Sequence, residues 1–158
     1  KAAVTAVGTT QEEIAYTGGG ARTSAYRLEP AAAIVVDVTH ATDYPGIDKR
    51  RHGEYKLGGG PVLSRGSAVN GAVFERLVAA AEKEKIPYSV EAAPRMTNTD
   101  ADHIFTAARG VATGLVSVPL RYMHSPNELV QLEDLDRAAR LLAAFARGLK
   151  SDAGFAPR

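Results

Sequence analysis

Cysteine and tryptophan are absent from this chain of 158 residues, and neither sign of charge dominates. The lack of cysteine excludes disulfide bonds and thiolate ligands, so any metal site must use histidine and carboxylate side chains. Nineteen basic and 18 acidic residues leave a net charge of +1. This balance gives no electrostatic reason to expect binding to nucleic acid or to a membrane surface. No apolar run approaches the roughly 20 residues that a bilayer-spanning helix needs.

The N-terminus has no signal-peptide pattern, and we expect a cytoplasmic protein. The chain opens abruptly at KAAVTAVGTT, within an apolar segment, so the missing signal would mean little if the chain were part of a longer protein. Its length and its 45% apolar content suit one domain with one hydrophobic core. We expect this domain to span residues 1–150 and residues 151–158 to form a flexible tail.

Apolar runs that predict strands alternate with segments that have helical spacing. The predicted strands cover residues 2–7, 31–38, 88–93 and 114–120, and the predicted helices cover residues 18–28, 70–85, 98–110 and 133–149. Residues 39–63 form a long irregular stretch, which in a compact domain is usually functional or contains short strands. The alternation predicts an α/β domain, with a mostly parallel mixed sheet flanked by helices on both faces.

Carboxylate and imidazole groups occur where the predicted strands end. Glu12 and Glu13 follow the first strand, Asp37 ends the second and His124 follows the fourth. In parallel sheets such groups gather beyond the carboxyl ends of the strands. Their donor atoms suit a divalent cation, and of two adjacent glutamates one can bind the metal while the other acts as a base. The three glycines at 18–20 would let the backbone turn sharply beneath such a site.

Each of these residues also has a simpler explanation. Adjacent glutamates at a strand end are commonly just exposed, a lone aspartate often caps a turn, and a single loop histidine is often without function. The spacing matches no short metal motif. Neither glycine triplet is followed by the Lys-Ser/Thr of a phosphate loop, and no serine has the context of a nucleophile elbow. Nucleotide binding and serine hydrolase chemistry are therefore poor fits.

Four segments taken together resemble the M42 family of metallo-aminopeptidases: TTQEE, AAAIVVDVTHATDYPG, NTDADHI and VPLRYMHSPNE. They occur in the family's order, and the resemblance extends from about Val4 to Leu149. The family includes glutamyl, deblocking and tetrahedral aminopeptidases. The resemblance therefore implies a zinc-peptidase-like catalytic domain that acts on peptides. It also implies two divalent metal ions, zinc or cobalt, as cofactors, and a homo-oligomer when the protein is full length.

The resemblance also implies a role for each of the four strand-end residues. Glu12 corresponds to the catalytic general base, and Glu13 to a ligand of one metal. His124 corresponds to a ligand of that same metal, and Asp37 to a ligand of the other. The strand-end pattern had singled out these four positions, but their separate roles come from the resemblance alone.

Further residues receive expected positions from the same comparison. Asp100 lies in NTDAD where the family usually has GTDA, so we expect it near the substrate or behind the metal ligands. His40 and Asp43 are expected to orient Asp37. Arg121 has two candidate partners, an acidic side chain of the substrate and Glu128.

The chain departs from the family pattern in two ways. IAYTGGG follows the paired glutamates where the family often has a Gly-Leu-Arg-Gly-like run, which alters the local loop. The family site also needs a histidine and a bridging aspartate upstream of QEE, and only eleven residues precede Glu12. We therefore expect a C-terminal portion of the catalytic domain, inactive or nearly so alone. We also expect an incomplete sheet with an exposed apolar edge that promotes association.

Two other classes of function compete with the aminopeptidase interpretation. One is a non-catalytic module for assembly or binding, in which the site residues are vestigial. The other is a related two-metal deacylase or carboxypeptidase. The joint presence of Glu12, Glu13, Asp37 and His124 favours catalysis for the full-length protein, whereas the short start favours the non-catalytic module for this chain. Assays on unblocked and N-acylated peptides separate the aminopeptidase from the deacylase.

Overall fold

The computed structural model describes residues 2–14, 17–150 and 153–155. Short helices and strands alternate along much of this part of the chain. In order they are α1 (Gly19–Leu28), β1 (Ala32–His40), α2 (Lys49–His52), β2 (Val62–Gly66), α3 (Gly71–Lys83), β3 (Ser89–Ala93), α4 (Ala101–Ile104), β4 (Ala112–Arg121), β5 (Leu129–Val130) and α5 (Leu132–Gly148). No helix of the described residues has both the length and the apolar character needed to cross a bilayer.

The strands form one mixed sheet in the order β1-β4-β2-β3, with β5 added to the end of β4. β1 is parallel to β4 and β2 is parallel to β3, whereas β2 and β5 run antiparallel to β4. β4 lies in the middle of this order, and its residues 113–120 are all buried. The predicted mixed α/β sheet is therefore confirmed.

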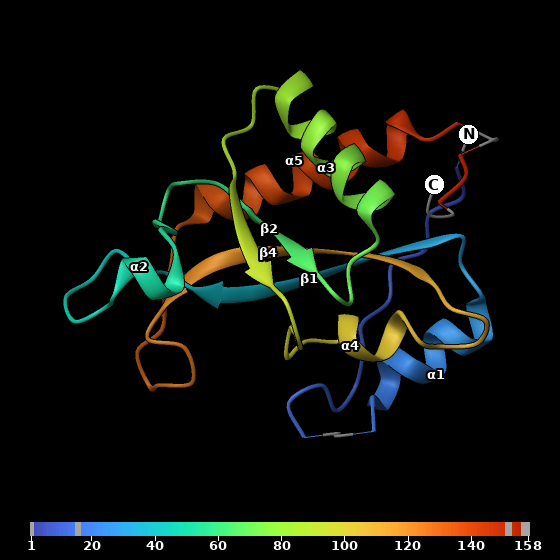
Figure 1. Cartoon of the computed structure of the whole chain (residues 1–158), viewed down its shortest axis with the longest axis horizontal. Coiled ribbons are helices and arrows are strands. Elements are labelled where there is room, and N and C mark those ends of the chain that lie inside the picture. The colour runs from blue at the N-terminus through green and yellow to red at the C-terminus, as the bar shows by residue number, and fades with distance from the viewer. Residues whose placement is uncertain (1, 15–16, 151–152, 156–158) are drawn as a thin grey trace.

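Helices cover both faces of the sheet, as Figure 1 shows. α3 and α5 pack on one face, where Leu77, Leu141 and Phe145 join Val116 of β4 in the main core. α1 and α4 lie on the other face, where a smaller cluster joins Val35 of β1, Leu115 of β4 and Ala101 of α4. The predicted helices on both faces are confirmed by this arrangement.

α3 forms where both the apolar spacing and the cap predict it. The Oδ1 atom of Asn70 accepts a hydrogen bond from the backbone N–H of Val73 at 3.1 Å, which satisfies one of the donors that a helix start leaves free. Val73, Leu77 and Ala81 are spaced four residues apart and are buried on the sheet side of the helix.

The long irregular stretch is fastened to the start of α5 by a buried carboxylate. Asp134 is fully buried, and its two oxygens accept the N–H groups of Gly58 at 2.7 Å and Gly60 at 2.8 Å. Arg137 donates to the carbonyl of Gly58 at 2.6 Å. This stretch contains α2 and the start of β2, in agreement with the expectation that it holds short elements of its own.

Two predicted elements differ from the structure. The predicted strand at 2–7 is wrong: these residues adopt no regular secondary structure, and Val4 is 74% exposed. An apolar run becomes a strand only when a neighbouring strand pairs with it, and no described strand pairs with residues 2–7. The helix predicted at 98–110 is short, because only Ala101–Ile104 is α-helical and turns follow it.

β1 is the outer strand on its side of the described sheet. Val36 and Val38 stand in register with the buried Val116 and Val118 of β4, yet they are 52% and 36% exposed. On this face the side chains of the outer strand β1 are therefore less covered than those of β4, which agrees with the expected exposed apolar edge.

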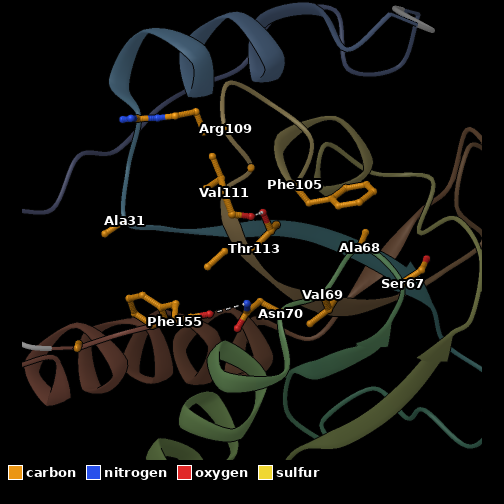
Figure 2. A pocket seen from close by; sticks show the side chains of 13 residues that line it. Ala31, Ser67, Ala68, Val69, Asn70, Phe105, Arg109, Val111, Thr113 and Phe155 are labelled. Atoms are coloured by element: carbon orange, nitrogen blue, oxygen red, sulfur yellow. Dashed lines mark hydrogen bonds between the residues drawn. The ribbon is translucent and has the colours of Figure 1, made fainter. Parts of the chain in front are cut away.

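A hollow of about 620 Å³ lies near the starts of β1 and β4, and Figure 2 shows its lining. One wall is Phe155, whose carbonyl accepts a hydrogen bond from Nδ2 of Asn70 at 2.9 Å. Residues 151–152 and 156–158 of the predicted tail lie outside the described residues, so its flexibility stays a prediction. The hollow lies at the opposite end of these strands from the carboxylates described next.

Candidate metal centre

The segment that carries the paired glutamates is held against the start of α1. The backbone N–H of Gly20 donates to the carbonyl of Thr10 at 2.9 Å. A Cβ atom on Gly20 would lie 2.6 Å from the Thr10 nitrogen, and one on Gly18 would lie 2.8 Å from the Cβ of His103. The glycines thus allow the chain to approach the Thr10 backbone and the His103 side chain closely, in addition to the turn that the sequence predicted.

Glu13 and His124 meet although they are 111 positions apart in the sequence. The Nε2 atom of His124 lies 3.3 Å from the Oε1 atom of Glu13. Both side chains are about 70% exposed, so they remain accessible to a ligand from solvent. Glu13 comes from the N-terminal segment, and His124 from the loop that joins β4 to β5.

Asp37 lies on β1, two residues beyond Val35 and therefore on the α4 face of the sheet. Burial raises the pKa of its carboxyl group above the ordinary value of 3.8. The N–H of Val38 donates to Oδ1 at 2.7 Å and opposes this rise in pKa. The nearby charges of Asp100 and Glu13 raise the pKa further, whereas His124 lowers it.

Glu12 lies within the same electrostatic cluster. Burial raises the pKa of its carboxyl group above 4.5, and the charges of Asp37, Glu13 and Asp100 add to this rise. His124 acts in the opposite direction and lowers that pKa. The structure therefore brings Glu12, Glu13, Asp37 and His124, with Asp100, close enough for their charges to interact, although no described strand precedes the two glutamates and Asp37 lies within β1.

Asp43 was expected to orient Asp37, but its carboxylate contacts a different residue. Asp43 pairs with Arg121: the guanidinium donates from Nε to Oδ1 at 2.8 Å and from Nη2 to Oδ2 at 2.9 Å. These bonds hold the pKa of Asp43 below 3.8. Arg121 therefore pairs with Asp43 and not with Glu128, which instead accepts the N–H of His124.

His40 is the last residue of β1, and strand alternation places it on the face opposite Asp37. Asp100 is buried, being only 8% exposed, and it directly precedes α4. Its charge raises the pKa values of both Glu12 and Asp37, so it lies near these two carboxylates. Its predicted place near the substrate or behind the metal ligands stays a prediction.

The donor chemistry of these residues fits a divalent cation with oxygen and nitrogen ligands. Glu13 and His124 supply a carboxylate and an imidazole in mutual contact, and several carboxylates lie beside them. No lysine or arginine side chain in the described part of the chain forms a salt bridge with Glu12, Glu13 or Asp37. Among the described residues, no group of three or more His, Asp or Glu side chains is arranged to hold a metal ion. The residues thus provide part of a ligand set, where a catalytic zinc site commonly takes three protein ligands.

Sequence reasoning missed one contact in this region. Oε1 of Glu128 accepts the backbone N–H of His124 at 2.6 Å. The segment YMHSPNE contains both residues, but four positions of separation in a loop do not reveal which backbone group a carboxylate meets.

Residues 1–141 match the family model of M42 glutamyl aminopeptidases. The chain belongs to the M42 family. This match over most of the chain confirms the resemblance of its four segments, which include TTQEE and VPLRYMHSPNE. The M42 chain therefore carries Glu12, Glu13, Asp37 and His124 within the matched region.

Individual relatives agree with this membership. The M42 chain is 38% identical over 144 residues to the lysyl aminopeptidase of Pyrococcus furiosus, covering 91% of this chain and 40% of that protein. It superposes on an aminopeptidase of the archaeon Desulfurococcus kamchatkensis with a TM-score of 0.80 and 40% identity, covering 90% of this chain and 40% of that one.

A third similar protein forms large assemblies. The Pyrococcus horikoshii TET1 peptidase, which can assemble into a tetrahedron or a large octahedral shell, matches with a TM-score of 0.66 and 28% identity. The match covers 89% of this chain and 40% of that protein. The M42 chain thus spans about 40% of the length of these relatives.

Proposed function

We propose that this chain is the portion of an M42 aminopeptidase domain that supplies the general base and several of the metal ligands. Glu12 is the base, Glu13 and His124 bind one metal ion, and Asp37 binds the other. The observation that carries the proposal is the 3.3 Å approach of His124 Nε2 to Glu13 Oε1, between side chains from two separate segments. Family membership supports the same roles.

Divalent cations held by these residues would supply the Lewis acidity that peptide hydrolysis at neutral pH requires. The crowding of carboxylates is consistent with a cation among them, because like charges this close otherwise destabilise one another. Zinc and cobalt both accept imidazole and carboxylate donors, and we propose one of these two metals.

Glu12 has the properties of a proton carrier. Burial raises the pKa of its carboxyl group above that of an ordinary glutamate, which favours uptake of a proton. In the proposed reaction Glu12 takes a proton from the attacking water and returns it to the leaving amine. Asp100, which the proposal does not assign to a metal, adds to the affinity of Glu12 for that proton.

The remaining parts of the proposal concern the whole protein. Its substrate is a peptide with a free N-terminus, and it assembles into a homo-oligomer, as the TET1 relative does. It acts in the cytoplasm, and neither nucleic acid nor a membrane is a partner. The chain alone is inactive or nearly so, because the full site needs ligands in addition to those named here.

A chimera tests the catalytic role directly. This chain replaces the matching 144-residue segment of the Pyrococcus furiosus lysyl aminopeptidase. With zinc or cobalt, we expect the chimera to release N-terminal residues from unblocked peptides but not from N-acetylated peptides. Glu12→Gln should lower kcat by about 10²- to 10⁴-fold. Full activity of Glu12→Gln would show that Glu12 is not the base. Cleavage of the acetylated peptide would favour a deacylase.

A further inference from the structure

The loop that carries His124 has an unusual backbone. Residues 122–128 join β4 to β5, whose antiparallel pairing sets Arg121 opposite Leu129. Tyr122 and His124 have φ angles of 62° and 60°, in the left-handed region that residues with a side chain rarely adopt. Such conformations persist only where surrounding contacts hold them.

One side chain holds the backbone at His124 itself. The carboxylate of Glu128 accepts the His124 N–H at 2.6 Å, a short bond with a charged acceptor. Glu128 directly precedes β5, so this bond joins His124 to the strand end on the other side of the loop. The ring of Tyr122 also packs 5.3 Å from that of Tyr44, measured between centroids.

The direction of the His124 side chain depends on this backbone. With φ near 60°, the imidazole reaches Oε1 of Glu13 at 3.3 Å. A change of φ to the common negative region would turn the Cβ of His124 to a different direction. The hydrogen bond from the His124 N–H to Oε1 of Glu128 therefore holds the backbone conformation on which the direction of the imidazole depends.

We propose that Glu128 is a positioning residue, whose carboxylate fixes the His124 loop so that the imidazole faces Glu13. The part of this inference that concerns metal affinity depends on the proposed function, whereas the placement of His124 does not. Glu128 acts through the backbone of His124. Its contribution therefore requires an acceptor oxygen, and the negative charge only strengthens the bond.

Two substitutions separate these requirements. Glu128→Gln keeps an acceptor oxygen and Glu128→Ala removes it. Glu54→Ala is the matched control, because Glu54 is an exposed carboxylate that pairs with Lys49 and Lys56 outside this loop. In the absence of metal, the measured quantity is the change in the NMR chemical shifts of the His124 ring when Glu13 is replaced by Gln. A melting curve of each variant reports whether the fold is intact.

The placement of His124 is tested first. We expect Glu13→Gln to shift the His124 ring resonances in the wild-type, Glu128→Gln and Glu54→Ala backgrounds, and to leave them unshifted in Glu128→Ala. Melting temperatures should be alike, since the loop is exposed. If the ring still responds to Glu13→Gln in the Glu128→Ala background, the positioning role is wrong.

A Zn²⁺ titration of the same variants then tests the link to the metal. We expect Glu128→Ala to bind Zn²⁺ about tenfold more weakly than wild type, and Glu128→Gln to bind like wild type. Equal, measurable affinity in Glu128→Ala and wild type would contradict the part of the inference that links the position of His124 to metal binding. If the ring contact is lost in Glu128→Ala and no variant binds Zn²⁺, Glu128 still positions His124 while the proposed metal site is wrong.

Discussion

The Nε2 atom of His124 lies 3.3 Å from the Oε1 atom of Glu13, although the two residues are 111 positions apart in the chain. Each residue lies in a segment without regular structure, and each segment is held by a separate contact. Gly20 fixes the Glu13 segment through Thr10, and Glu128 fixes the His124 loop. The candidate metal centre therefore depends on how these two segments are held.

Gly20→Ala should disturb the segment that carries Glu13. The new Cβ would lie 2.6 Å from the Thr10 nitrogen, so the backbone around Thr10 must move. We expect the affinity of the chain for Zn²⁺ to fall about tenfold, as measured by calorimetric titration. Gly8→Ala is the control, since a Cβ there meets nothing within 4 Å. Unchanged affinity in Gly20→Ala would show that Thr10 does not hold Glu13.

Asp43→Asn should lower the free energy of unfolding by about 1–2 kcal/mol at pH 7, because it weakens the two charged hydrogen bonds to Arg121. The pKa of Asp43 is lowered in the folded protein, so its contribution is present above the unfolded value near pH 4. It is lost as the pH falls through the folded pKa. The difference between variant and wild type should therefore shrink below about pH 4.

Urea titrations at pH 7, 5 and 3 check this dependence for Asp43→Asn. A difference that stays constant from pH 7 to pH 3 would contradict the link to the Asp43 pKa. Asp136→Asn is a suitable control, since Asp136 is 68% exposed and its contact with Arg140 is 3.9 Å long.

Asp134→Ala should be strongly destabilising, by about 2–4 kcal/mol. The substitution leaves the N–H groups of Gly58 and Gly60 without their acceptor, and it leaves Arg137 without a carboxylate 3.5 Å away. Chemical denaturation of the variant measures the loss. A loss below about 0.5 kcal/mol, the usual effect of a surface substitution, would show that Asp134 does not anchor the long loop.

Phe155→Ala should lower the free energy of unfolding by about 1 kcal/mol. Arg76 lies 4.7 Å from the centroid of the Phe155 ring and donates to the carbonyl of Gly154 at 3.1 Å. Phe155→Leu keeps apolar contact but removes the aromatic ring, so it should lose less than Phe155→Ala. Thermal melting compares the two variants, and equal stability of Phe155→Ala and wild type would mean that Phe155 adds nothing to the fold.

Much of the fold could be predicted because its signals are local. Asn70 followed by an apolar stripe predicts α3, and the apolar runs after Ala31 and after Gly110 predict β1 and β4. The predicted strand at 2–7 shows the limit of such signals. An apolar run specifies that a segment suits a strand, but pairing depends on a neighbour elsewhere in the chain. β2 was not predicted as a separate strand because it is short and follows a loop rich in glycine.

The candidate site could be predicted in part. The strand-end pattern singled out Glu12, Glu13, Asp37 and His124, and the structure brings these residues into one electrostatic cluster. Their separate roles came from the family resemblance and stay proposals. The contact of Glu128 with His124 depends on tertiary geometry, which sequence spacing does not contain.

A Co²⁺ or Zn²⁺ titration of this chain, beside Glu13→Ala and His124→Ala, tests most directly whether these two residues hold the same metal. We predict that wild type binds the metal and that each substitution weakens binding at least about tenfold. We also predict that the double variant binds little more weakly than either single variant, because one lost ligand already breaks a shared site. Binding of equal strength in wild type and both single variants would contradict the account.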